Sequence, residues 1–166
     1  MKEVKKEVEV LELIYQNILM LKESVISVLK IKVLDELFVN DLKEILIIYK
    51  KIMQAVSGML KTRNKDVKIL GVGEKFVNYV GIKINLNNTN DEKDIAGTLI
   101  HDINFRTNNI IKAVKEYSKI SKTIINLVNR ITISCQKCNK KLEKYVKTAW
   151  KLLHLCTFCS IIFITF

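Results

Sequence analysis

Apolar residues recur along the chain with the spacing of an α-helix. In the first segment they fall alternately three and four residues apart, at Leu11, Ile14, Ile18, Leu21, Val25 and Val28. This spacing places them on one face of a helix, in the heptad pattern of packed helices. A second segment repeats the alternation at Leu42, Ile45, Tyr49, Ile52, Val56 and Met59. We expect this second helix to end between Gly58 and Lys61.

Polar residues predict where the second helix begins. Asn40 and Asp41 interrupt the apolar pattern, and Glu44 follows Asp41 by three residues. This arrangement is similar to a capping box, in which two side chains bind the free backbone N–H groups at a helix start. The sequence therefore predicts a helix start at about Asp41.

The longest apolar stripe lies in the second half of the chain. It keeps the same alternation from Ile100 to Ile131, through Ile103, Thr107, Ile110, Val114, Tyr117, Ser121, Ile124 and Val128. The stripe predicts one continuous helix, preceded by a polar stretch in which Asn90 or Asp91 can serve as the cap.

The region between the second and third stripes, residues 64–90, is less regular. VKILGVG and GIKINLN alternate enough to predict short strands, so a short β-hairpin can form near residues 66–87. Three apolar stripes need partners, because an isolated amphipathic helix is marginal in water. We expect an all-α bundle of three to five helices with heptad-like seams over residues 1–134, able to self-associate. A lysine-rich, cysteine-containing apolar segment follows over residues 135–166.

Composition agrees with a helical protein. The 166 residues include no proline and five glycines, which argues against a turn-rich β-sandwich or barrel and against a disordered chain. Hydrophobic residues make up 49% of the chain, enough for a packed core. The amino terminus, MKEVKKEVEV, lacks the apolar stretch of a secretory signal peptide. We therefore expect a cytoplasmic protein, at the cytoplasmic face of a membrane if it binds one.

The net charge of +11 is concentrated in the last third of the chain. Residues 111–166 carry eleven basic and two acidic residues, whereas residues 1–60 are neutral. A basic face attracts the phosphates of an anionic lipid surface or of nucleic acid, or is simply a solvated helix face. Only three basic residues are Arg, the side chain best suited to nucleic-acid readout, so lipid is the favoured partner. The lysines expected at an anionic surface are Lys137, Lys140, Lys141, Lys144 and Lys147.

An uncharged apolar run, LLHLCTFCSIIFITF, occupies residues 152–166. Basic residues, then a tryptophan, then an apolar run is the order expected at a membrane boundary. Fifteen helical residues cover roughly 22 Å, short of a hydrocarbon core of about 30 Å. We expect the run to span the membrane as a tail anchor, to lie in the interface, or to enter the membrane partway and pack against partners. The alternative is that it forms core of the bundle. The residues expected to contact the membrane are Trp150, Lys151, Leu152, Leu153, Phe158, Ile161, Ile162 and Phe163.

The four cysteines form two C-x2-C pairs separated by 17 residues, at Cys135, Cys138, Cys156 and Cys159. This spacing is typical of a four-thiolate zinc site. No glycine or proline lies nearby to form the tight turn of a zinc knuckle, and cysteines three apart share a face of a helix. Buried thiols are therefore the favoured interpretation, zinc is the first alternative and a redox pair is a lesser one.

Groups able to carry out catalysis are sparse. The two histidines, His101 and His154, belong to no catalytic motif, so we expect no enzymatic activity and no cofactor other than zinc. The pattern favours a non-enzymatic, self-associating helical protein that contacts a membrane through its basic-flanked apolar tail. An accessory or toxin-like role rests on analogy alone. The alternatives are a four-cysteine zinc module with a basic face for nucleic acid, and a soluble helical scaffold.

Overall fold

The computed structural model describes residues 2–65, 91–117 and 120–162, and the side chains of residues 5–65, 91–117 and 120–147. This part of the chain forms four α-helices and no strand: α1 (Lys2–Val28), α2 (Glu36–Lys61), α4 (Glu92–Glu116) and α5 (Lys122–Ile162). The all-α bundle expected from the apolar stripes is thereby confirmed. The β-hairpin expected near residues 66–87 lies outside the described residues.

Aspartates cap two of the helices. The Asp91 carboxylate accepts a hydrogen bond from the backbone N–H of Lys93 at 2.9 Å and starts α4, as predicted. In α2 the cap is Asp35, whose carboxylate accepts from Leu37 N–H at 2.8 Å. The predicted start at Asp41 is therefore wrong, since Asp41 lies inside α2 and is buried. Helix α2 ends at Lys61, as predicted, and Asn64 then takes a positive φ of 55°.

The third apolar stripe does not form one helix. The chain leaves helical geometry at Tyr117, which is extended, and α5 starts again at Lys122. The break is stabilised from elsewhere in the chain, because the Glu7 carboxylate accepts a hydrogen bond from the backbone N–H of Ser121 at 3.0 Å. The same carboxylate binds Arg63 at 2.8 Å, so Glu7 joins the start of α1, the end of α2 and the start of α5.

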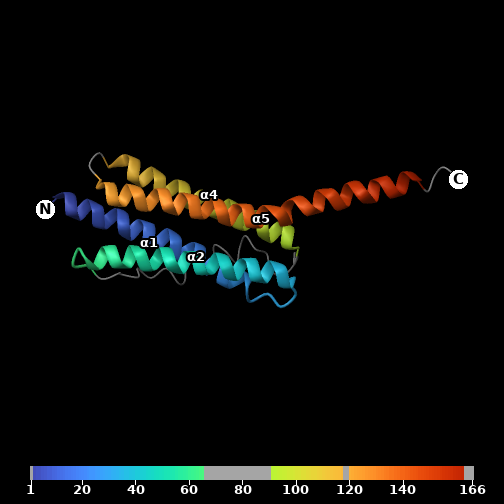
Figure 1. Cartoon of the computed structure of the whole chain (residues 1–166), viewed down its shortest axis with the longest axis horizontal. Helices are drawn as coiled ribbons and strands as arrows, with labels where there is room; N and C mark the ends of the chain where they lie inside the picture. Colours follow the sequence, from blue (N-terminus) through green and yellow to red (C-terminus); the bar gives the residue numbers. More distant parts are fainter. Residues whose placement is uncertain (1, 66–90, 118–119, 163–166) are drawn as a thin grey trace.

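Each helix packs against two antiparallel neighbours (Figure 1). The contact of Glu7 with Arg63 sets α1 against α2, and the contact of Ser24 with Asp102 sets α1 against α4. Helices α4 and α5 also pack together, whereas α2 and α5 touch less extensively. Because α2 and α4 are both antiparallel to α1, they run in the same direction, so the end of α2 and the start of α4 lie at opposite ends of the bundle.

The core is built from the predicted stripes. All six stripe residues of α1 are buried, as are Leu42, Ile45, Tyr49, Ile52 and Val56 of α2, where Leu60 takes the core position expected of Met59. The core continues along α5 as far as Cys135, Cys138 and Leu142. Helix α5 thus passes unbroken through the expected domain boundary between residues 134 and 135.

One ion pair is buried between α1 and α4. The Arg106 guanidinium lies 2.8 Å from the Asp102 carboxylate, and their side chains are 5% and 12% exposed. Ser24 of α1 donates a hydrogen bond to Asp102 at 2.8 Å, and Arg106 also contacts the Met20 sulfur. The ion pair lies within α4, and the contacts of Ser24 and Met20 with it favour one alignment of α1 on α4, because a displaced α1 would leave buried polar groups with fewer partners.

Candidate functional site

The candidate functional site is the end of the bundle at which α5 continues past the other helices. It centres on an exit cluster formed by Asp41 of α2 with Lys141, Lys144 and Tyr145 of α5. The Tyr145 hydroxyl donates a hydrogen bond to the Asp41 carboxylate at 2.6 Å, and both lysines form ion pairs with it. The Tyr145 ring also packs edge-on against Phe38, with centroids 4.6 Å apart. The exit cluster therefore fastens α5 to the first turns of α2.

The charges of the exit cluster stabilise one another. Burial disfavours the ionised form of Asp41, but hydrogen bonds from Lys144, Tyr145 and Lys141 outweigh it, so the pKa of Asp41 is lowered. Burial, together with the hydrogen bond to Asp41, raises the pKa of Tyr145 to about 12. Hydrogen bonds to Glu44 and Asp41 raise the pKa of Lys141. At neutral pH the carboxylate and both lysines are thus charged, so the ion pairs of the exit cluster are formed.

The structure divides the five lysines predicted to bind an anionic surface into two groups. Lys141 and Lys144 belong to the exit cluster, and Lys147 pairs with Glu143 on the same helix at 3.1 Å. Lys137 and Lys140 are exposed and form no ion pair with a described residue. That these five lysines contact an anionic surface stays a prediction. Lys137 and Lys140 are the two whose charges are not paired with a described carboxylate.

Beyond the exit cluster, α5 projects without a neighbouring described helix (Figure 1). Sixteen residues follow Val146 in this helix, about 24 Å of its length. They include seven of the residues predicted to contact a membrane, from Trp150 to Ile162, whose side chains lie outside the described part, and Phe163 is outside it altogether. Among the described residues, no helix combines the length and apolarity of a membrane-crossing segment.

The first cysteine pair is part of the core. Cys135 and Cys138 are both free thiols, 2% and 0% exposed. Burial raises the pKa of Cys135, and burial together with the neighbouring Cys135 raises that of Cys138 to about 12. Both are therefore protonated at neutral pH, whereas zinc binds the thiolate.

The second cysteine pair lies farther along the same helix. Cys156 is 21 residues beyond Cys135 in the continuous α5, about 31 Å along its axis, and the side chains of Cys156 and Cys159 are outside the described part. The four-cysteine zinc site stays a prediction, because the second pair contributes no described side chain. Among the described side chains, no group of three or more potential ligands comes together to hold a metal.

No protein-family model matches this chain, and neither a curated protein nor a solved structure is significantly similar to it. The function is therefore inferred from the geometry of the chain itself. That geometry shows two features that the sequence did not suggest: the exit cluster around Asp41, and a groove between α2 and α5. A signal for the groove exists in the sequence, because residues 45–61 and 122–142 contain no acidic residue at all.

Proposed function

We propose that the protein is a non-enzymatic helical protein that contacts a membrane surface through the carboxyl-terminal part of α5. The observation that carries this proposal is the projection of α5 past the bundle, since residues 152–162 contain no charged residue other than the titratable His154. An apolar helix that has no neighbour among the described helices needs an apolar partner, and a lipid interface provides one.

The exit cluster supports the proposal mechanically. Asp41 holds Lys141, Lys144 and Tyr145 at the end of the bundle, so the projecting helix leaves from a fixed point. The exposed side chains of Lys137 and Lys140 lie within three turns of that point and can approach lipid phosphates. The bundle would then stay on the side of the membrane where these lysines lie.

Self-association remains part of the proposal, through a different surface. The apolar stripes of α1 and α2 are buried within one chain, so they are not available to a second copy without unfolding. The projecting part of α5 has no neighbour among the described helices, and it is the segment through which copies would meet at a membrane.

Flotation with liposomes tests the membrane proposal. The full chain should float with neutral vesicles, and a chain that ends at Lys151 should remain at the bottom of the same gradient. A full-length variant with Leu153→Lys and Ile161→Lys should lose at least tenfold in bound fraction, because each charge is costly in an apolar interface.

The matched control is a Lys137→Gln, Lys140→Gln variant, which keeps the apolar segment intact. We expect it to float on neutral vesicles as the full chain does and to lose only the additional binding to anionic ones. Equal flotation of the full chain and of the chain ending at Lys151 would overturn the proposal.

A further inference from the structure

The interface between α2 and α5 contains a groove that the contacts of the bundle leave open. Its volume is about 210 Å³. Helices α2 and α5 pack together less extensively than the other neighbouring helix pairs of the bundle. An enclosed cavity of about 150 Å³ is already large enough for a benzene-sized guest. The groove is lined by four residues from each helix: Ile48, Lys51, Ile52 and Ala55 of α2, and Leu127, Arg130, Ile131 and Ser134 of α5.

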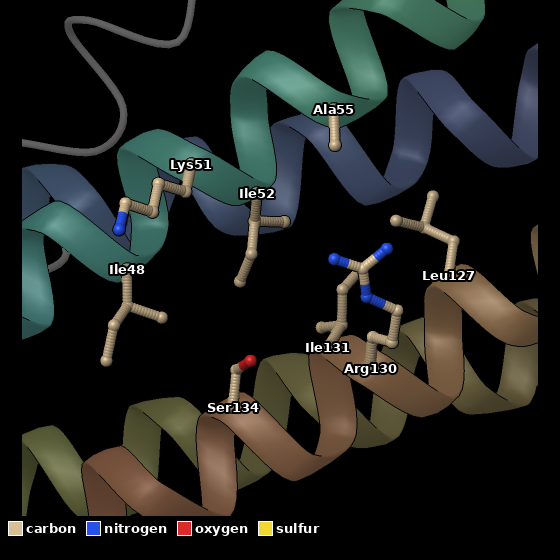
Figure 2. Close-up of a pocket in the computed structure, with 8 residues that line it drawn as sticks. All are labelled: Ile48, Lys51, Ile52, Ala55, Leu127, Arg130, Ile131 and Ser134. Carbon is tan, nitrogen blue, oxygen red and sulfur yellow. The ribbon is translucent and has the colours of Figure 1, made fainter.

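The walls of the groove are apolar and its charges are all positive. Figure 2 shows the side chains of Ile52 and Ile131 directed between the two ribbons, with the guanidinium of Arg130 extending from α5 toward α2. Lys51 contributes the second cation from α2. No acidic residue occurs in residues 45–61 or 122–142, so these two helical stretches bring no carboxylate to either side of the groove. Such a site favours an anion.

Arg130 differs from the other two arginines of the chain. Arg63 binds the Glu7 carboxylate, and Arg106 binds that of Asp102. Arg130 forms no ion pair or hydrogen bond with a described residue, although a guanidinium is the side chain best shaped to bind a carboxylate with two parallel hydrogen bonds. It is therefore available for a ligand.

The apolar surface continues beyond the groove. Ile47 lies one helical turn from Lys51, and Ile133 lies one turn from Arg130, so each shares a face with a groove cation. Their side chains are 51% and 53% exposed, which is unusual for isoleucine and leaves room for an apolar chain longer than the groove.

We infer that the α2–α5 groove binds a single-chain anionic amphiphile, namely a carboxylate on a short hydrocarbon chain. The chain would lie against Ile48, Ile52, Leu127 and Ile131, and the carboxylate would accept hydrogen bonds from Arg130. The apolar walls exclude a bare inorganic anion as the preferred ligand, and the two cations exclude a neutral lipid. This site is distinct from the projecting part of α5 and does not depend on membrane contact.

Titration calorimetry of the full chain with octanoate, below its micelle-forming concentration, tests the inference. We expect one binding site per chain and binding at least tenfold weaker for 1-octanol and for acetate, which lack the carboxylate and the chain respectively. Arg130→Gln should weaken octanoate binding about tenfold, because it removes a charge-assisted hydrogen bond. Ala55→Phe should abolish binding without changing a charge, because it fills the groove.

Lys50→Gln is the matched control. Lys50 is adjacent to Lys51 in sequence but lines a separate hollow between α1 and α2, so its loss removes the same charge from a different surface. It should leave octanoate binding unchanged. Equal losses in Lys50→Gln and Arg130→Gln, or unaltered binding in Ala55→Phe, would overturn the inference, since binding would then be non-specific or located elsewhere. Far-UV circular dichroism confirms that each variant retains its helices.

Discussion

The two sides of the bundle at which one hairpin meets the other, α1–α4 and α2–α5, each contain one arginine and use it differently. Arg106 is 4% exposed and tied to Asp102, Ser24 lies beside it, and the helices are in close contact. Arg130 is exposed, has no partner among the described residues and borders an open groove. The α1–α4 side therefore fixes how the two hairpins pack, whereas the α2–α5 side is the one at which we propose that a ligand binds.

The strongest test of this comparison is Asp102→Ala. It removes the carboxylate from a buried guanidinium and should cost about 3–5 kcal/mol of the free energy of unfolding. Urea denaturation followed by circular dichroism measures the loss. Arg130→Ala is the control on the open side and should change stability by no more than about 0.5 kcal/mol. Equal losses in the two variants would contradict the assignment of the sides.

The second test removes the charge of Asp41, the carboxylate of the exit cluster that joins α2 to α5 at one end of the bundle. Asp41→Asn keeps the shape of the side chain but loses its charge, so Lys141 and Lys144 lose their common partner. We expect a loss of about 1–3 kcal/mol, as for hydrogen bonds to a charged group. Thermal unfolding at pH 7 measures it, and an unchanged melting temperature would show that the exit cluster does not fasten α5.

The pH dependence of stability sharpens the second test. Hydrogen bonds from Ser121 and Arg63 lower the pKa of Glu7 despite its partial burial, and the pKa of Asp41 is lowered as well. Both carboxyls therefore bind protons more readily in the unfolded chain, so their contribution is complete well above the ordinary values of 4.5 and 3.8. It is lost as the pH falls through and below these values. The wild-type chain should lose stability steeply between pH 5 and pH 3, as measured by urea unfolding, and Asp41→Asn should show a smaller slope there.

The smallest expected effect is that of Lys147→Ala. Its partner Glu143 lies on the same helix, and both side chains are exposed, so the pair holds no second element in place. The change should be within about 0.5 kcal/mol in the same urea experiment. A loss as large as that of Asp41→Asn would mean that this ion pair stabilises more than a single turn of α5.

The apolar stripes predicted α1 and α2 well because their side chains meet within the helical core, where spacing decides burial. The single helix expected from Ile100 to Ile131 was wrong for a physical reason. Tyr117 and Ser121 keep the stripe in phase across the break, and no glycine or proline marks it. What holds the break is the Glu7 carboxylate on Ser121, a contact across 114 positions of sequence.

The candidate site was predictable only in part, for a similar reason. The run of lysines near the carboxyl end is visible in the sequence. Asp41, which forms ion pairs with Lys141 and Lys144, lies 100 residues from Lys141 and cannot be recognised as their partner from the sequence. Its position after Asn40 and before Glu44 suggested a helix cap instead. The sequence does not distinguish Arg130 from the other two arginines, since only the folded chain shows that Arg63 and Arg106 bind carboxylates.

The common direction of α2 and α4 has a consequence for how the protein assembles. The end of α2 and the start of α4 lie at opposite ends of the bundle, separated by about 39 Å, the length of α2. Within the α1–α2 hairpin and within the α4–α5 hairpin, the contacting residues are close in sequence. Because both hairpins belong to one chain, each is present at a high effective concentration near the other. Cleavage of the chain between Lys65 and Asp91 is therefore expected to convert a unimolecular fold into a complex of two hairpins that dissociates on dilution.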